Sequence, residues 1–127
     1  MKIKNQEIVN FANTILGDKH LPVRISYAIH KNAASIEPAL KAYDEVRKKL
    51  IEQYAEKDGE GKPIIADGKY IIENAEAFNA DMAELNTEEV EIEVHKVSVS
   101  EFEKLDDPKF DALTVSEMAI LNFMIEE

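Results

Sequence analysis

The chain of 127 residues contains no cysteine, which excludes disulfide bonds, thiol catalysis and thiolate metal sites. It also has no apolar run near the roughly 20 residues that a membrane-spanning helix needs. The opening segment, residues 1–7, lacks the apolar centre of a secretory signal. Basic residues are scarce, since 15 lysines and arginines face 26 acidic residues and leave a net charge of −11. We therefore expect a cytoplasmic protein that stays out of membranes and does not bind nucleic acid.

The charge is unevenly distributed along the chain. Residues 1–31 hold five bases and two acids, whereas the remaining residues hold ten bases and 24 acids. A positive end on an acidic body favours head-to-tail contact between subunits, or the binding of a small anion. The other interpretation is that the acidic surface only keeps the protein soluble.

A heptad-like run of side chains dominates the first half of the sequence. Its members alternate spacings of four and three: Ile25, Ile29, Asn32, Ile36, Ala39, Tyr43, Val46 and Leu50. Such spacings keep side chains on one side of a helix. We expect one long helix over residues 22–57, kinked at Pro38 because proline removes a backbone hydrogen bond inside a helix. The alternative is two helices that meet near Ser35.

Shorter helices are expected near the two ends of the sequence. Residues 5–16 carry an apolar stripe, with Asn5 as N-cap and Gly17 as the stop signal. Thr114 and Glu117 have the spacing of a capping box that opens a helix over residues 115–125. That helix is apolar nearly all round, so we expect it to be deeply buried or shared with another subunit.

The second half of the chain predicts a small antiparallel sheet. Residues 63–73 contain two apolar runs around Asp67-Gly68, the strongest local signal for a hairpin. Residues 88–97 alternate apolar and polar side chains, as a strand with one wet face does, and this strand is expected to pair with the hairpin. Asn74 is placed to cap a helix over residues 75–85.

These elements predict an α+β fold that is mostly helical, in a single domain over residues 1–127. A long kinked central helix lies in a helical part, residues 1–57. Residues 58–127 supply the hairpin, a helix, one strand and the apolar C-terminal helix. The hydrophobic fraction of 45% is sufficient for a packed core.

No catalytic or metal-binding motif emerges from the sequence. Residues 59–62 lack the glycine spacing of a phosphate loop and the aspartate ladder of a calcium loop. Glu91, Glu93 and His95 share one strand face, but neighbours on such a face lie about 6.6 Å apart and do not converge on one ion. We expect no enzymatic activity, no cofactor and no metal site.

The first candidate binding surface is an interface between copies of the chain. The apolar run and the C-terminal helix predict that interface at Ile25, Ile29, Asn32, Ile36, Leu121 and Phe123. Asn32 is polar within the run, and two interpretations are open for it. It either fixes the register of paired helices or faces water at the edge of the interface.

The second candidate surface is a ligand site next to that run. Four side chains fall along adjacent turns: His20, Arg24, Tyr27 and Lys31. Tyr27 is suited to stack on a base while the cations meet phosphate. The alternative is that these amphipathic side chains frame an interface.

Three segments carry a resemblance to a known group of proteins. Residues 1–10 (MKIKNQEIVN), 42–50 (AYDEVRKKL) and 113–118 (LTVSEM) resemble small proteins of unknown function encoded by tailed phages and prophages of Gram-positive bacteria. The resemblance implies a phage origin and a role in the cytoplasm of the host cell. It implies no site residues.

The main functional hypothesis is a non-enzymatic phage accessory protein that self-associates and binds a macromolecular partner, such as a host or phage protein. An alternative is a sponge that sequesters a small anionic host signal such as a cyclic nucleotide. A further alternative is a component of the virion or of tail assembly.

Overall fold

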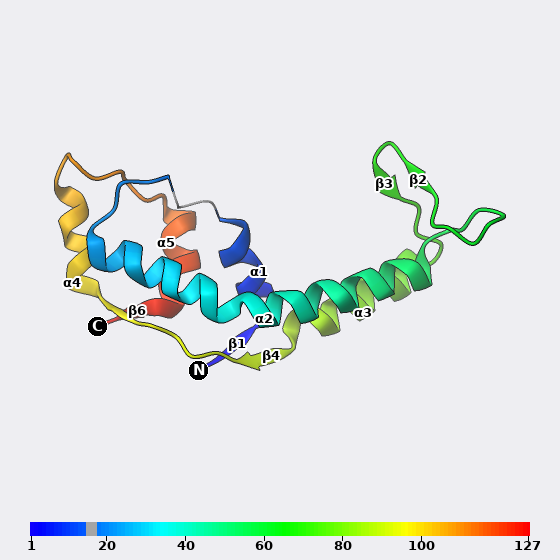
Figure 1. Ribbon diagram of the computed structural model, residues 1–127, viewed down its shortest axis with the longest axis horizontal. Coiled ribbons are helices and arrows are strands. Elements are labelled where there is room, and N and C mark those ends of the chain that lie inside the picture. Colours follow the sequence, from blue (N-terminus) through cyan, green and yellow to red (C-terminus); the bar gives the residue numbers. More distant parts are fainter. Residues whose placement is uncertain (15–17) are drawn as a thin grey trace.

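The computed structural model describes residues 1–14 and 18–127 and divides into a head and a narrow arm (Figure 1). The head holds both ends of the chain and the helices α1 (Asn5–Asn13), α4 (Val99–Phe102), η1 (Glu103–Asp106), α5 (Val115–Leu121) and η2 (Asn122–Met124). The arm carries the strands β2 (Ile65–Ala66) and β3 (Lys69–Tyr70) at its tip, followed by helix α3 (Ala75–Thr87). The long helix α2 (Val23–Tyr54) belongs to both parts. The predicted α+β, mostly helical fold is therefore confirmed.

Helix α2 continues through Pro38 without interruption and changes direction near its middle (Figure 1). Pro38 has no N–H to donate to the carbonyl four residues earlier, which explains a bend at this point. The prediction of one long helix is confirmed, with the bounds Val23–Tyr54, and the alternative of two helices is wrong. Ser35 lies inside the helix and its hydroxyl donates to the Lys31 carbonyl at 3.2 Å.

The N-terminal helix differs from the prediction at its start. It follows strand β1 (Lys2–Lys4) directly, so that Lys4 and not Asn5 occupies the N-cap position. Asn5 is buried, and its side-chain amide donates to the Leu85 carbonyl at 2.9 Å. Its contact therefore joins α1 to the end of α3. The predicted stop at Gly17 lies outside the described residues.

The strands pair differently from the prediction. Strand β4 (Glu89–Glu91) runs antiparallel to β1, and β5 (Val97–Ser98) runs parallel to β6 (Ile125–Glu126). The hairpin β2–β3 lies at the tip of the arm (Figure 1), and the residues that flank it pair with the segment just after α2, Ala55 with Ile72 and Lys57 with Pro63. The predicted pairing of the hairpin with the strand at 88–97 is therefore wrong. The physical reason is that Ile92 is buried in the head, whereas the length of α3 separates the hairpin from it.

Local turn and cap signals agree with the structure more closely. Asp67 and Gly68 have φ of 51° and 77°, as the predicted hairpin turn requires. Asn74 caps α3 by accepting a hydrogen bond from the Ala77 N–H at 3.1 Å. The capping box of Thr114 and Glu117 is present, although α5 ends at Leu121 and not at residue 125.

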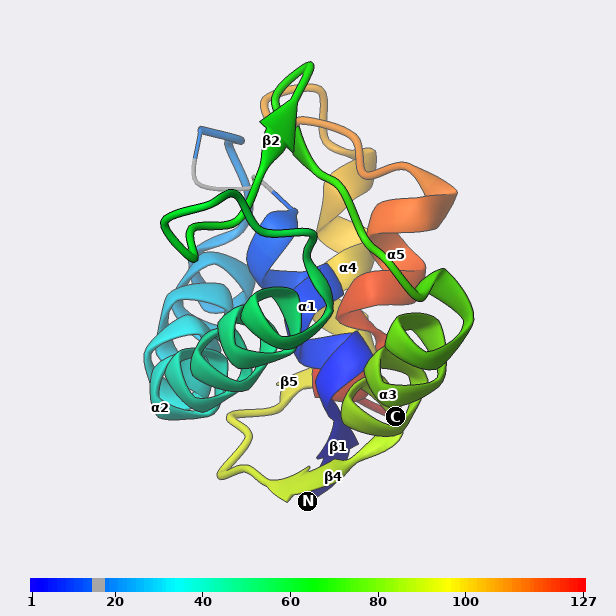
Figure 2. The same ribbon diagram turned by 90° about the vertical axis from the view of Figure 1, so that its right-hand side faces the viewer.

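The hydrophobic core lies in the head, and the arm has little core of its own. Fully buried side chains of the head include Ile8, Ile25, Ile36, Leu121 and Met124. In contrast, α3 contains no buried residue. Figure 2 looks along the arm and shows α2 and α3 side by side, with the hairpin at the tip nearest the viewer. The arm is thus formed mainly by two helices, and α1 of the head contacts the end of α3 through Asn5.

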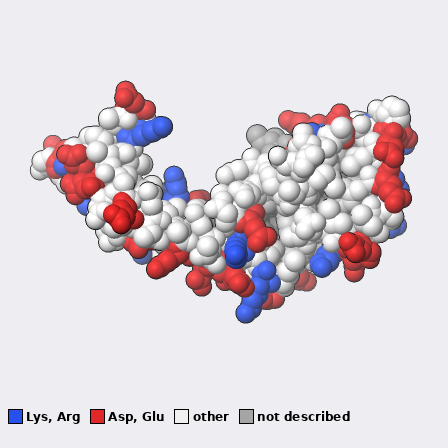
Figure 3. All heavy atoms as spheres, turned by 180° about the vertical axis from the view of Figure 1, so that it is seen from behind, with Lys and Arg blue, Asp and Glu red and all other residues white. Residues whose placement is uncertain are grey.

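The surface carries charges of both signs, with acidic side chains on head and arm alike (Figure 3). This distribution follows the excess of acidic residues in the sequence.

Candidate functional site

The apolar face of α2 belongs to the core of the head and is not a surface between subunits. Ile25 and Asn32 are fully buried, Ile36 is 2% exposed and Ile29 is 9% exposed. Helices α1 and α4 and strand β5 contact α2 within the same chain. The predicted oligomer interface at these residues is therefore wrong, because a second copy cannot reach side chains that the first copy has already covered.

The C-terminal residues of the predicted interface also pack within the chain. Leu121 is fully buried. Phe123 is half-buried, and its ring meets that of Phe11 edge to face with the ring centres 5.2 Å apart. The interface predicted at Leu121 is therefore wrong, because this residue belongs to the core. The interface predicted at Phe123 stays a prediction, since its half-buried side chain also packs against the core of its own chain.

Asn32 has a role that neither interpretation of the sequence included. Its amide nitrogen donates to the His95 carbonyl at 2.9 Å, and its oxygen accepts from the His95 N–H at 2.7 Å. The buried side chain therefore holds the backbone of the segment between β4 and β5 from a distance of 63 residues in the sequence. It fixes the position of His95 beside the first turns of α2.

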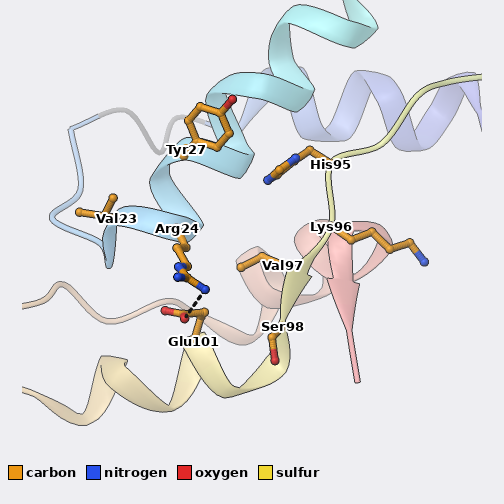
Figure 4. A pocket seen from close by; sticks show the side chains of 8 residues that line it. All are labelled: Val23, Arg24, Tyr27, His95, Lys96, Val97, Ser98 and Glu101. Atoms are coloured by element: carbon orange, nitrogen blue, oxygen red, sulfur yellow. Dashed lines mark ion pairs between the residues drawn. The ribbon is translucent and has the colours of Figure 1, made fainter.

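A cavity of about 400 Å³ lies where that segment passes α2 (Figure 4). Its lining residues are Val23, Arg24, Tyr27, His95, Lys96, Val97, Ser98 and Glu101. The structure thus brings Arg24 and Tyr27 of the predicted ligand site to one cavity. His20 and Lys31 are exposed and do not line it. The main chain of His20 is held elsewhere, because its N–H donates to an Asp111 carboxylate oxygen at 2.6 Å.

The upper part of this cavity is aromatic. The rings of Tyr27 and His95 meet edge to face, with their centres 5.2 Å apart and their planes at 84°. Val97 points toward the cavity between them and Glu101, whereas the side chain of Lys96 extends away from it (Figure 4). The wall is therefore apolar and aromatic on this side.

The lower part of the cavity is charged. The side chain of Glu101 is only 10% exposed, and its Oε2 lies 2.7 Å from the Lys104 Nζ. That contact is a close ion pair, although its geometry is not that of a hydrogen bond. Arg24 lies farther away, with Nη1 3.9 Å from Oε1 of Glu101, and its side chain remains 79% exposed (Figure 4).

Sequence reasoning missed His95 and Glu101 as members of this site. It assigned His95 to a solvated strand face and gave Glu101 no role. In the structure the strand predicted over residues 88–97 is limited to Glu89–Glu91, so the strand assignment is wrong for His95, which lies exposed on the segment between β4 and β5. Moreover, nothing in residues 88–97 indicates that His95 shares a site with Asn32 and Arg24, because helix α2 is far away in the sequence.

A second hollow, which we call the arm groove, lies between α2 and α3 and measures about 290 Å³. Its lining residues are Val46, Leu50, Asp81, Glu84, Leu85 and Glu88. Val46 is 42% exposed, and Leu50 and Leu85 are half-buried. The bottom of the groove, which we call its floor, is thus apolar and open to solvent, and the acidic residues Asp81, Glu84 and Glu88 lie along its edge.

Two tyrosines of α2 hold the arm together on either side of this groove. The Tyr43 hydroxyl donates to Asn86 Oδ1 at 2.7 Å, and the Tyr54 hydroxyl donates to Asp81 Oδ2 at 2.6 Å. The hydrogen bond to the Asp81 carboxylate raises the pKa of Tyr54 above its ordinary value, because it stabilises the neutral phenol. The two helices are therefore fixed to each other by polar contacts as well as by apolar ones.

The two helices of the arm differ in charge. Helix α3 carries Glu76, Asp81 and Glu84 and no lysine or arginine. The second half of α2 is richer in bases, which are Lys41, Arg47, Lys48 and Lys49. One side of the arm is thus acidic, and the other carries most of the basic side chains.

Comparison with family models, with curated proteins and with solved structures finds no match for this chain. Within residues 1–14 and 18–127, no three histidine or acidic side chains are grouped so that they could hold a metal ion. No helix in the same ranges combines the length and apolarity needed to cross a membrane. The cavity beside Tyr27 and the arm groove, with the charged side chains around them, are therefore the two candidate binding surfaces.

Proposed function

We propose that the protein is a non-enzymatic binding protein that self-associates through its arm. The observation that carries this proposal is that α3 has no buried residue, although it packs against α2. Two helices cannot cover each other fully, and here the apolar floor of the arm groove stays open at Val46, Leu50 and Leu85. A second pair of helices laid on this face makes a four-helix bundle, which is the usual way to bury such side chains.

A second copy of the chain is the partner that best fits the charges of the arm. In a two-fold antiparallel pairing, α2 of one copy lies against α3 of the other. Arg47 and Lys49 flank the Val46 and Leu50 stripe of α2, so they approach the acidic α3 of the other copy, and the two-fold axis repeats this pairing. Charge complementarity of this kind orients two surfaces more than it adds affinity.

The resemblance to phage-encoded proteins supports a wider form of this proposal. The assembled protein is then an accessory protein in the cytoplasm of the host cell that engages a host or phage macromolecule. Self-association is the part of this role that the geometry of the arm supports.

Light scattering coupled to gel filtration tests the self-association directly. At micromolar concentration the protein should have a mass above the 14.4 kDa of one chain. Val46→Glu places a charge on the open floor of the groove and should return the mass to that of a monomer. Val99→Glu is the matched control, since Val99 lies on the head with an exposed fraction of 43%, close to the 42% of Val46.

A wild-type protein that remains monomeric at these concentrations contradicts the proposal. Equal dissociation by Val46→Glu and Val99→Glu also contradicts it, because the arm would then have no special part in assembly. Circular dichroism of both variants establishes that a change of mass does not arise from unfolding.

A further inference from the structure

The cavity beside the first turns of α2 has the features of a built ligand site. Its volume of about 400 Å³ is within the range of small-molecule sites, which is roughly 300–1,000 Å³. Asn32 fixes His95 on one wall through two hydrogen bonds. Val97 is buried and lies in β5, which pairs with β6. The walls therefore keep their positions without a ligand, and this preorganisation favours binding.

The aromatic part of the cavity suits a flat ring. Tyr27 is 54% exposed, so that much of its face is free of protein contacts. His95 meets it edge to face, and Val23 and Val97 complete an apolar wall. A ring placed here gains stacking on the phenol and contact with the valines.

The charged part of the cavity suits an anion. Lys104 already pairs closely with the buried Glu101, at 2.7 Å. Arg24 stays 3.9 Å from the same carboxylate and is 79% exposed, so its guanidinium retains free donors. Among the side chains that line the cavity, Arg24 and Lys96 are basic and Glu101 is acidic, which leaves one positive charge in excess, in a protein whose net charge is −11. Arginine recognises phosphate and carboxylate through paired hydrogen bonds.

We propose that this cavity binds a small anion that carries an aromatic or heteroaromatic ring, with the ring against Tyr27 and His95 and the anionic group on Arg24. A nucleoside monophosphate has this chemistry. The inference is independent of self-association, because the cavity lies in the head and the groove lies on the arm.

Titration of the full chain with AMP and UMP, followed by amide chemical shifts, tests the proposal. Either nucleotide should shift the amides of Tyr27, His95 and Val97. Adenosine alone and inorganic phosphate alone should bind at least about tenfold more weakly, because each offers only half of the contacts.

Two pairs of variants assign the two halves of the site. Arg24→Gln should weaken nucleotide binding by about tenfold or more, whereas Arg47→Gln on the arm should leave it unchanged. Tyr27→Ala should also weaken binding, whereas Tyr70→Ala should not, and Tyr70 is a fair match because it is 46% exposed on the hairpin.

Two outcomes overturn the inference. The first is that neither nucleotide shifts the cavity amides at millimolar concentration. The second is that Arg24→Gln and Arg47→Gln weaken binding equally, which would indicate non-specific attraction to basic side chains. The amide shifts and the comparison of the two arginine variants have the same meaning whether the protein is a monomer or an oligomer.

Discussion

Asn32 illustrates how one buried polar side chain fixes the path of a distant segment. Its amide exchanges two hydrogen bonds with the backbone of His95, in the manner of a neighbouring strand. The segment between β4 and β5 needs such a partner, because buried backbone groups without one destabilise the fold. The same bonds place His95 beside Tyr27.

Replacing Asn32 with alanine should therefore lower the stability of the head. The variant loses both hydrogen bonds and leaves a small cavity, at a cost of about 2 to 3 kcal/mol. Urea unfolding measures the change. Asn79→Ala is the control, since Asn79 is exposed on α3 and its replacement should be neutral or slightly stabilising. Equal effects of the two replacements would show that the contact with His95 does not matter.

Glu117 gives the head a dependence on pH. Its carboxylate accepts a hydrogen bond from the Thr114 backbone at 2.9 Å and pairs with Lys19 at 3.2 Å. These contacts, with the backbone bond first, lower the pKa of Glu117 below its ordinary value of 4.5. Because the folded state favours the charged carboxylate, the stabilisation by these contacts is fully present at pH values above the ordinary pKa of 4.5. It is lost as the pH falls through the lower pKa of the folded state.

Glu117→Gln should consequently be less stable than the wild type at neutral pH, and the difference in melting temperature should close as the solution becomes more acidic than the folded pKa. Glu52→Gln, at an exposed position on α2, should give a smaller difference with less change over the same range. Thermal melts at several pH values provide the measurement. A difference that stays constant with pH would contradict a lowered pKa at Glu117.

Single residues of the candidate site were only partly predictable from the sequence. Arg24 and Tyr27 share a helical face, so their spacing of three is enough to place them together. Glu101 was not predictable, because its burial results from packing of α4 beside the start of α2. The apolar run was read correctly as one face of a helix, but a sequence pattern does not say whether that face meets its own chain or another.

At the scale of elements, turns and helix caps were predictable from the sequence, whereas the pairing of distant strands was not. The hairpin turn, the Asn74 cap and the capping box at Thr114 were predicted correctly, because each depends on a few consecutive residues. The partner of β4 was predicted wrongly, since β1 lies at the other end of the chain. Strand pairing depends on which side chains share a core, and in this protein Ile3 and Ile92 do so.

The hairpin at the tip of the arm provides a test at this scale. Gly68 has φ of 77°, and a side chain there is strained by about 1 kcal/mol or more, although nothing crowds the position. Gly68→Ala should accelerate hydrogen exchange of the Ile71 N–H, which donates to the Ile64 carbonyl at 3.2 Å. The melting temperature should change little, because the hairpin is remote from the core of the head.

Gly59→Ala is the matched control for this variant. Gly59 lies in the same part of the arm, has no positive φ and has open space around its Cα. It should leave exchange at Ile71 unchanged. Equal acceleration in both variants would mean that the hairpin does not depend on the turn at Asp67-Gly68.

At the scale of the whole molecule, the head contains most of the hydrophobic core, whereas the arm exposes apolar side chains in the arm groove. The head buries the first part of the apolar run, from Ile25 to Ile36, and contains the cavity beside Tyr27. Beyond Pro38 the same helix extends into the arm, where α3 runs beside it (Figure 1). This division is not visible in the sequence, because the apolar spacing continues through both halves of α2. It also moves the expected oligomer interface from the buried residues to the arm groove.

Antiparallel pairing of two arms predicts a long particle with the heads at opposite ends. The arm part of α2, residues 39–54, is about 24 Å long at 1.5 Å per residue, and this overlap sets the separation of the heads. Small-angle X-ray scattering of the assembled protein should therefore give a pair-distance distribution with a second maximum from distances between the heads. Val46→Glu should remove that maximum together with the higher mass. A compact particle with one maximum would instead mean that the heads associate, and would leave the arm groove for another partner.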